Sequence, residues 1–486
     1  YRKRMVDAYR SNKGRGRYVR LSNERISYTQ LKEIKQLPLI RRGVYKSGFY
    51  AVDLNLRVKP FNSLGSRTIG GIYAESGKGN AGLEKRFDDY LQGEDGLAIR
   101  ERMANQWQYI PIREEKHGCD VYTTLDANLM DICESNLRAR LEHTQADWGC
   151  VILMEVATGE IKAMCNLDRG SDLQYYEIAN HAVVRMEPGS TFKTIAMMAA
   201  LDDGKVNIDD TLRVWKDGWY YHGATHRDAH PADTVYTMRQ ALAVSSNIAL
   251  ARMITDGYNG SAKKFVNKLK RMGLCDSIDY IIPGAHQARI IIPNDTVTIS
   301  RMAYGYSVEL SPLQILTFYN GIANDGKMIS PVLVSQVRDG KKILEEFETQ
   351  TIRSSLCRKG TLEDIRASLL DVVWDNDLGT AAMNKWRQRK AQRDLVKIAG
   401  KTGTAQIIEN GKYQSHKHRM SFVGYFPAEN PQYTCICVIH NPHNRGAYDS
   451  GLDCGSVVRK IAEKTMVYSS EYTIQSDELV MVPMKR

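Results

Sequence analysis

The chain has 486 residues, 43% of them hydrophobic and 25% charged, which is typical of folded globular proteins rather than disordered ones. A chain of this length predicts two or three domains. It contains no run of about 18 apolar residues, so no membrane-spanning helix is predicted within it. Residues 1–50 hold 14 lysines and arginines and three acidic residues, so the net charge of this segment, +11, equals the net charge of the whole chain.

The basic first segment predicts contact with an anionic membrane surface, an acidic partner or nucleic acid, although a solvated face of a small domain explains it equally well. No zinc-finger spacing or aromatic RNA-binding motif supports nucleic acid. The nine cysteines include no C-x-x-C pair, which argues against a structural zinc site and a disulfide-stapled fold. Cys435 and Cys437 alternate in a strand-like run, as small apolar residues on one face would.

Residues 1–117 are rich in charge, glycine and turns, and we predict that they form a non-catalytic module. The segment "GGIYAESGKGN" resembles a phosphate-binding loop but has the wrong spacing, because five residues instead of four separate Gly71 from Gly77. No Ser or Thr follows Lys78 either. We therefore interpret this segment as a turn.

The composition shifts near Gly118, where a short strand is followed by a helix with Leu129, Ile132 and Leu137 on one side. A strand hairpin with its turn at 157–160 comes next, and helical patterns dominate from about residue 190 to 330. A second hairpin surrounds the turn "PAENP". Strands at both ends with helices between them predict an α+β domain, residues 118–486, with an antiparallel sheet covered by helices.

The first candidate catalytic motif is "MEPGSTFK", which places Ser190 at the start of a predicted helix and Lys193 one turn further along the same face. Partial burial of the lysine favours the neutral amine, which can take a proton from the serine. The alternative is a helix-capping serine with a solvent-reaching lysine. The catalytic interpretation is supported by an apolar stripe on the predicted helix, which is expected to be buried. The stripe consists of Phe192, Ile195, Ala196 and Ala199.

Two further polar clusters follow along the chain. In "ALAVSSNIALARM", Ser245 and Asn247 lie between apolar stretches, where they need partners, although a helix cap or helix-joining turn also explains them. In "IAGKTGTAQI", the segment from Lys401 to Thr404 offers a cation and backbone N–H groups on a strand, which suit a carboxylate and a developing oxyanion. A strand-end turn is the alternative interpretation there.

Each of the outer motifs has a second copy elsewhere in the chain. "SAKK", from Ser261 to Lys264, opens no apolar helix and is predicted to be a solvated helix face. "KSG", from Lys46 to Gly48, lies in the basic segment upstream of both other clusters. Neither copy has the context of the motifs above.

Ser-x-x-Lys, Ser-x-Asn and Lys-Thr-Gly in this order are the signature set of penicillin-binding proteins and serine β-lactamases. The sequence resembles a class B penicillin-binding protein, a monofunctional peptidoglycan transpeptidase, over nearly its whole length. "TTLDANLM", "EVATGEIKAMC" and "SFVGYFPAENPQY" resemble segments of that family's catalytic domain. The opening departs from the family pattern, because the expected membrane helix and Arg-Gly-rich segment are missing.

The resemblance implies a transpeptidase domain of the serine β-lactamase-like fold, preceded by an elongated, dimerisation- or pedestal-like module. It implies that Ser190 is the nucleophile, that Lys193 is the general base, and that Ser245 relays the proton to the leaving D-Ala. Lys401 is expected to orient Ser245 and to supply positive potential.

The resemblance also assigns substrate contacts. Asn247 is expected to hold the substrate amide, and Thr402, Gly403 and Thr404 to bind its terminal carboxylate region. The backbone N–H groups of Ser190 and Thr404 are expected to form the oxyanion hole. No metal or organic cofactor is implied.

The implied function is D,D-transpeptidation of peptidoglycan stem peptides during septal cell-wall synthesis, with β-lactams acylating the same serine. Division-type members resemble the chain more than elongation-type members do. The expected location is the outer, periplasmic face of the cytoplasmic membrane, with a single-pass anchor in the full-length parent. The expected partners are a separate glycosyltransferase and other divisome membrane proteins, not nucleic acid.

Three alternatives remain open. A serine β-lactamase is disfavoured because no Glu-x-x-Leu-Asn string lies between Asn247 and Lys401, and because the second motif reads Ser-Ser-Asn instead of Ser-Asp-Asn. A β-lactam sensor or a non-catalytic division scaffold would keep the fold without the turnover.

Overall fold

The computed structural model describes residues 26, 28–51, 58–103, 106–276, 281–282, 284–290, 292, 295–382, 396–409, 411–444 and 449–474. The chain forms two compact units, residues 1–60 and 61–486. The predicted boundary after residue 117 lies within the second unit and stays a prediction. No described helix combines the length and apolar character needed to cross a bilayer.

The described part of residues 1–60 contains short helical elements: α2 (Tyr28–Gln36), η1 (Ile40–Arg42) and α3 (Val44–Ser47). Much of the basic segment, residues 1–25, lies outside the described residues. The partner of this segment therefore stays a prediction.

The second unit begins with small elements that precede the main sheet. The segment "GGIYAESGKGN", which we interpreted as a turn, does form a turn, because β1 (Gly71–Ile72) and β2 (Gly79–Ala81) pair as an antiparallel hairpin around it. A longer antiparallel hairpin follows, made of β3 (Leu97–Met103) and β4 (Gln106–Arg113). The short helices between these hairpins are α4 (Ser66–Ile69), α5 (Gly82–Arg86) and α6 (Asp88–Leu91).

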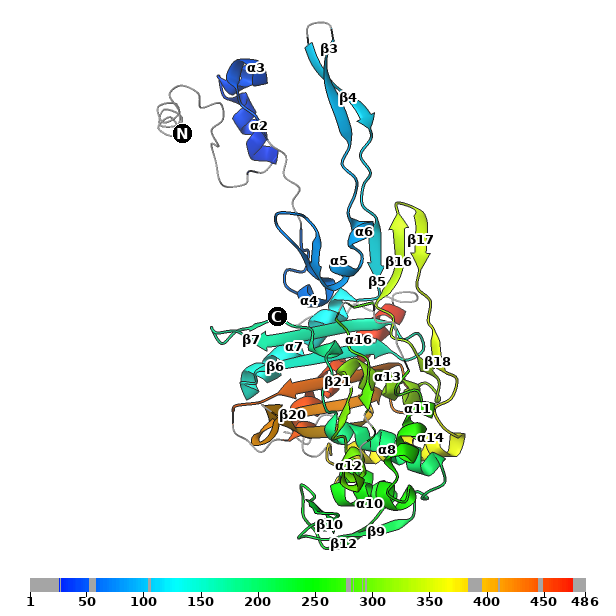
Figure 1. Ribbon diagram of the computed structural model, residues 1–486. Helices are drawn as coiled ribbons and strands as arrows, with labels where there is room; N and C mark the ends of the chain where they lie inside the picture. Colours follow the sequence, from blue (N-terminus) through cyan, green and yellow to red (C-terminus); the bar gives the residue numbers. More distant parts are fainter. Residues whose placement is uncertain are drawn as a thin grey trace. The chain divides into compact units, whose positions relative to one another are not determined.

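A six-stranded antiparallel sheet is the centre of the second unit (Figure 1). The predicted hairpins are both present, and the first strand of one pairs with the last strand of the other, with Ile152 opposite Ile436. The α+β prediction is therefore confirmed. In spatial order the strands are β19 (Ala399–Glu409), β20 (Lys412–Phe426), β21 (Tyr433–His440), β6 (Trp148–Glu155), β7 (Ile161–Arg169) and β8 (Tyr175–Tyr176).

Alternate residues of each strand pack against different helices, as the period of two requires. One face packs against α7 (Ala127–Thr144) and α16 (Ser456–Ile474), and both Cys435 and Cys437 are buried there, as predicted. Helix α7 begins where Asp126 accepts hydrogen bonds from the N–H groups of the first turn. The predicted apolar side of α7 packs on this sheet face.

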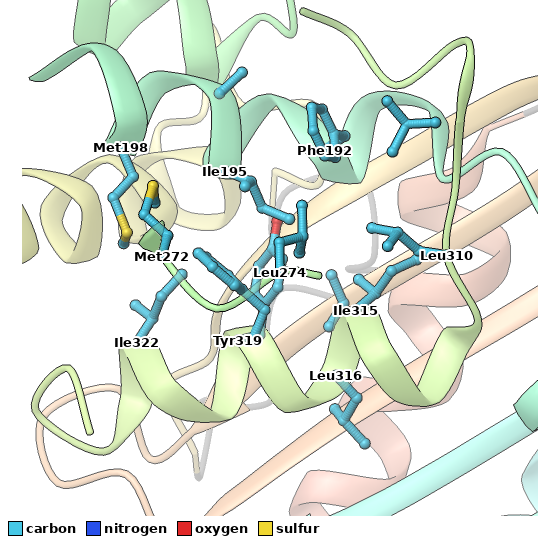
Figure 2. Close-up of a cluster of buried hydrophobic side chains, with 14 of the residues drawn as sticks. Phe192, Ile195, Met198, Met272, Leu274, Leu310, Ile315, Leu316, Tyr319 and Ile322 are labelled. Atoms are coloured by element: carbon cyan, nitrogen blue, oxygen red, sulfur yellow. The ribbon is translucent and has the colours of Figure 1, made fainter. Parts of the chain in front are cut away.

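The opposite face of the sheet carries the larger helical layer. Its helices are α8 (Phe192–Asp202), α9 (Met238–Ala243), α10 (Asn247–Gly257), α11 (Ala262–Arg271), α12 (Thr296–Met302), α13 (Pro312–Ala323) and α14 (Lys359–Trp374). Figure 2 shows Phe192, Ile195 and Met198 of α8 facing the side chains of α13, among them Tyr319.

Helix α8 differs from the prediction in one respect. Its residues 192–201 are all buried, so α8 has no solvent face and the expected apolar stripe is only one part of its contact surface. Because α13 is also buried along its whole length, the pair forms the interior of the layer. Lys193 lies in this interior.

Short strands and turns connect the helices. They form two-stranded antiparallel pairs and one three-stranded sheet of order β17-β16-β5. Their bounds are β5 (Asp120–Thr123), β9 (Thr211–Val214), β10 (Trp219–Tyr221), β11 (Ala224–His226), β12 (Thr234–Thr237), β13 (Arg289–Ile290), β14 (Val308–Glu309), β15 (Met328–Ile329), β16 (Val334–Asp339), β17 (Lys342–Glu346), β18 (Thr351–Arg353), η2 (His181–Val183), η3 (Gly189–Thr191) and η4 (Gly451–Gly455).

Candidate active site

Ser190 lies in η3, a single 3₁₀ turn that leads directly into α8. Thr191 fixes the turn, because its Oγ1 donates to the Pro188 carbonyl over 2.9 Å. Tyr319 of α13 donates from its hydroxyl to the Thr191 carbonyl over 2.9 Å. Ser190 is half-buried, and its hydroxyl makes no hydrogen bond within the described residues. The serine is therefore held by its backbone while its Oγ stays available for reaction.

The η3 turn packs tightly against β19, the strand that carries the third motif. A Cβ at Gly403 would lie 2.3 Å from Ser421 Oγ and 2.9 Å from Thr191 Cγ2. Gly189 has a φ of +57°, and a Cβ there would lie 3.0 Å from the Thr404 carbonyl oxygen. Gly189 therefore needs glycine because of its left-handed backbone and its approach to β19, whereas a side chain at Gly403 would collide with the Ser421 and Thr191 side chains.

Ser245 lies in the junction between α9 and α10. The helix-joining turn, which was the alternative to a catalytic role for this cluster, is therefore present, and it carries the candidate residue. Its φ of +58° is in the left-handed region, which is uncommon for a residue with a side chain. Ser246, not Ser245, caps α10, because its Oγ accepts the Ala249 N–H over 3.0 Å. The capping by a neighbour leaves Ser245 for the site.

The Lys193 side chain joins the first two motifs. Its Nζ donates to the Ser245 carbonyl over 2.5 Å and to Ser245 Oγ over 3.0 Å. The side chain is 0% exposed, more than the partial burial we predicted, and this burial lowers its pKa to about 7. A neutral amine has two N–H bonds and one lone pair, so the two bonds to Ser245 leave the lone pair of Lys193 able to accept a proton.

Lys401 of β19 is equally buried, at 0% exposed. Burial and the nearby Lys193 amine both lower the pKa of Lys401. Its Nζ donates to the carbonyl and the Oγ1 of Thr402, over 3.1 Å and 3.2 Å, and not to Ser245 as its expected orienting role implied. Two buried amines that repel each other cannot both be charged without a large cost, so they disfavour each other's protonation.

The hydroxyl of Thr402 is held inside the protein. It is 2.7 Å from Thr380 Oγ1 in addition to its bond from Lys401, and the side chain is only 4% exposed. The Thr380 N–H donates to the Ala243 carbonyl at the end of α9 over 3.2 Å, so Thr380 links β19 to the Ser245 turn. Thr404 is more accessible, with its Oγ1 3.2 Å from Ser450 Oγ. Of the two threonines, Thr404 is better placed for a substrate carboxylate.

The outer edge of β19 carries backbone N–H groups that no strand covers, because β19 is the last strand of the sheet. The Gln406 N–H points to this edge, where it donates to the Tyr306 hydroxyl over 3.3 Å. Alternate residues of a strand direct their N–H groups to the same edge, so the Thr404 N–H points there as well. The Ser190 N–H lies at the start of η3, where helical N–H groups have no partner within the helix.

The three predicted clusters therefore lie around one point of the fold. The structure brings together all of the predicted site residues: Ser190, Lys193, Ser245, Asn247, Lys401, Thr402, Gly403 and Thr404. The second copies of the motifs lie on α11 and at the end of α3. In the part of the chain that the structure describes, no group of three or more His, Cys, Asp or Glu side chains is arranged to hold a metal ion.

Sequence reasoning missed three residues at the site: Asp228, Thr380 and Tyr306. Asp228 contacts the residues after Ser245, and its position 18 residues before Ser246 gives no local signal. Thr380 and Tyr306 belong to no motif, and only the packing of β19 against its surroundings places them here.

Comparison with known proteins shows the same fold and family. A family described as "Penicillin binding protein transpeptidase domain" matches residues 149–463. The "Probable peptidoglycan D,D-transpeptidase PenA" of Neisseria meningitidis serogroup A is 27% identical over 420 residues, which are 83% of this chain and 67% of that protein. "Stage V sporulation protein D" of Bacillus subtilis is 26% identical over 451 residues, 86% of this chain and 64% of that protein.

Solved structures agree with these matches. Penicillin binding protein 3 of Mycobacterium tuberculosis, in complex with aztreonam, has a TM-score of 0.70 and 25% identity, and the match covers 85% of this chain and 90% of that chain. Penicillin Binding Protein 2X of Streptococcus thermophilus has a TM-score of 0.71 at 20% identity, over 84% of this chain and 62% of that chain. With its motifs gathered on this fold, the chain belongs to the penicillin-binding protein transpeptidase family, as its resemblance to the class B members predicted.

Proposed function

We propose that this protein is a serine D,D-transpeptidase that crosslinks peptidoglycan stem peptides through an acyl-enzyme on Ser190. The single observation that carries the proposal is the buried Lys193 amine, hydrogen-bonded to Ser245 and one helical turn from Ser190. Relatives named as peptidoglycan D,D-transpeptidases support the reaction class. The aztreonam complex of a structural neighbour supports β-lactams as inhibitors.

In the proposed acylation, Ser190 Oγ attacks the carbonyl carbon of the penultimate D-Ala while its proton passes to the lone pair of Lys193. The C–N bond to the terminal D-Ala then breaks, and the leaving nitrogen receives a proton through the Ser245 hydroxyl, which lies 3.0 Å from Lys193 Nζ. The products of this half-reaction are an ester on Ser190 and free D-Ala. A positioned base of this kind contributes about 10²–10⁴-fold.

In the second half-reaction an amine of a neighbouring stem peptide attacks the ester carbonyl. Its proton passes to the same Lys193–Ser245 pair, the ester C–O bond breaks, and Lys193 returns a proton to Ser190 Oγ, so the products are the amide crosslink and free Ser190. The developing negative charge on the carbonyl oxygen is stabilised in both steps by the N–H groups of Ser190 and Thr404, at a helix start and on the open edge of β19. Splitting one difficult transfer into two steps is the usual gain from a covalent intermediate.

The proposed substrate contacts use residues at the rim of this pair. Asn247 is half-buried, and its Nδ2 donates to the Arg227 carbonyl over 2.8 Å. This bond fixes the orientation of the Asn247 side-chain amide, which is proposed to hold the substrate amide. Thr404 and the bare backbone at Gly403 are assigned to the terminal carboxylate, with positive potential from Lys401 when it is protonated. Thr402 contributes by holding Lys401.

The cellular role proposed here is septal cell-wall synthesis on the periplasmic side of the cytoplasmic membrane, with glycan strands made by a separate glycosyltransferase. The division-type character of the sequence supports this role, and so does the Mycobacterium tuberculosis penicillin binding protein 3 among the structural neighbours. An anchor in the full-length parent and divisome partners are part of the same proposal.

The test separates a transpeptidase from a protein that only binds β-lactams. The purified protein is incubated with a stem-peptide thioester and a D-amino acid, and in parallel with a penicillin. We expect acyl transfer to the D-amino acid together with penicillin labelling. Labelling without transfer would identify a β-lactam sensor, and neither labelling nor transfer would identify a non-catalytic scaffold. Rapid turnover of the penicillin itself would identify a β-lactamase.

A further inference from the structure

A carboxylate outside the three motifs anchors the turn that carries Ser245. Asp228 follows β11, and its Oδ2 accepts a hydrogen bond from Ser246 Oγ over 2.8 Å. Its Oδ1 accepts from the N–H groups of Asn247, over 2.6 Å, and Ile248, over 2.9 Å. Asp228 therefore binds three consecutive residues that begin directly after Ser245.

The position of these bonds matters because Ser245 has a left-handed backbone. A left-handed conformation is unfavourable for a residue with a side chain and persists only where the surroundings fix it. Asp228 fixes the residues after Ser245, and the Thr380 N–H fixes the Ala243 carbonyl before it. The carbonyl and hydroxyl of Ser245 are the two acceptors that hold the Lys193 amine, so loosening this turn would release that amine.

The carboxylate also has an electrostatic effect on the site. Two titratable groups interact electrostatically with Lys193: Asp228 from the loop after β11, and Lys401 from β19. The Ser245 carbonyl and hydroxyl accept the two hydrogen bonds of the Lys193 amine. Tyr236 of β12 also interacts with Asp228: burial raises the pKa of that tyrosine, and the Asp228 charge raises it further. The Asp228 charge opposes the effect of burial on Lys193 and raises its pKa.

The second motif of this chain has Ser246 where the Ser-Asp-Asn form has an aspartate. Because the Ser246 hydroxyl donates to Asp228, a carboxylate still lies beside the motif, supplied from a segment 17 residues before Ser245. It lies at the N-terminus of α10, where a negative charge is favoured by the helix dipole.

We propose that Asp228 is a positioning residue of the acyl-transfer reaction, which holds Ser245 and Asn247 in place and supplies the negative charge facing the Lys193 amine. The inference rests on the proposed function, since it concerns how the base of that reaction is tuned. Asp228 does not touch the reacting atoms and acts through Ser245 and Lys193.

The experiment measures the rate of acylation by a penicillin as a function of pH for three variants. Asp228→Asn keeps the shape and can keep accepting the two backbone N–H bonds but removes the charge, so the acid limb of the profile should move by roughly one pH unit toward acid. Asp228→Ala also frees the turn, so its rate at the plateau should fall by about 10²-fold. Thermal unfolding of each variant checks that it is folded.

Asp371→Asn is the matched control. Asp371 of α14 pairs with Arg239 of α9, the helix before Ser245, so it supports the same region without facing Lys193. Its acid limb should coincide with that of the unmodified protein. If Asp228→Asn leaves the acid limb in place, or if Asp371→Asn shifts it equally, the assignment is overturned.

The proposed function fails separately from this inference. If the unmodified protein is not acylated at all, the transpeptidase proposal falls, whatever Asp228 does. If the unmodified protein is acylated normally and only the Asp228→Asn profile is unshifted, the transpeptidase proposal stands and the Asp228 assignment falls. A poorly folded Asp228→Ala variant would leave the decision to Asp228→Asn.

Discussion

The starts of α8 and α11 carry the same Ser-x-x-Lys pattern but differ in what the serine and the lysine do. At α11, Ser261 is the N-cap, and its Oγ accepts the Lys264 N–H while the Lys264 side chain lies in solvent. At α8, Ser190 caps nothing and Lys193 is completely buried. The Ser-x-x-Lys pattern alone therefore does not indicate a catalytic site. The burial of the helix that follows it distinguishes the two copies.

Two structural differences account for the contrast. The η3 turn precedes α8 and moves Ser190 ahead of the helix start, so its hydroxyl is not used for capping. Helix α8 is buried on all sides, whereas α11 has an exposed face with Lys263 and Lys264 on it. The surrounding protein therefore lowers the pKa of one lysine to about 7 by burial and leaves the other hydrated.

The largest effect is expected from removing the buried lysine. Lys193→Ala should acylate about 10²–10⁴-fold more slowly with a penicillin, because no base remains beside Ser190. Lys264→Ala should acylate at the unmodified rate, since that lysine lies on a solvated face. Stopped-flow or quenched intact-mass kinetics measure both rates. A Lys193→Ala rate close to that of the unmodified protein would remove this lysine from the mechanism.

The pH dependence sharpens the comparison further. The pKa of Lys193 is lowered to about 7, so below that pH the amine is protonated and cannot accept the serine proton. The acylation rate should fall by about tenfold per pH unit below this value and reach a plateau above it. An acylation rate that rises only near the usual lysine pKa of about 10 would show that the amine is not desolvated in solution.

The packing of η3 on β19 provides a third test. Gly403→Ala places a methyl group 2.3 Å from Ser421 Oγ of β20 and 2.9 Å from Thr191 Cγ2 of the turn that holds Ser190, so these side chains must shift, at a cost of about 1–3 kcal/mol in unfolding free energy. Acylation should slow along with it. Gly360→Ala in α14 is the control, because nothing lies within 4 Å of the added atom. Equal unfolding temperatures for the two variants would contradict the close approach.

The smallest effect is expected from the capping serine. Ser261→Ala removes an N-cap and should lower the unfolding free energy by about 1 kcal/mol, with acylation unchanged. Urea denaturation and penicillin labelling of the same sample measure the two outcomes. A loss of acylation larger than the loss of stability would mean that Ser261 has a role beyond capping.

The sequence predicted the parts of the site that are encoded locally. The spacing of Ser190 and Lys193 and the burial of the following helix are visible in one segment, and so are both hairpins of the sheet. The ordered motifs then indicated that segments more than 50 residues apart meet. The motifs could not indicate which hydrogen-bond partners hold the amines of Lys193 and Lys401.

The missed features depend on contacts between distant segments. Asp228 reaches the Ser245 turn from a loop with no motif, and Thr380 reaches Thr402 from the segment after α14. Lys401 was expected to orient Ser245 and to supply positive potential, and that role stays a prediction, whereas the hydrogen bonds from its amine to the carbonyl and Oγ1 of Thr402 were not predicted. Such choices follow from packing and cannot be inferred from composition or spacing.

The most direct measurement is the intact mass of the protein after exposure to a penicillin, followed by peptide mapping of the adduct. A single adduct on Ser190, absent from Ser190→Ala and retained by Ser261→Ala, is the result expected if the neutral amine in the core activates the neighbouring hydroxyl. An adduct on Ser261, or an unmodified protein, would contradict it.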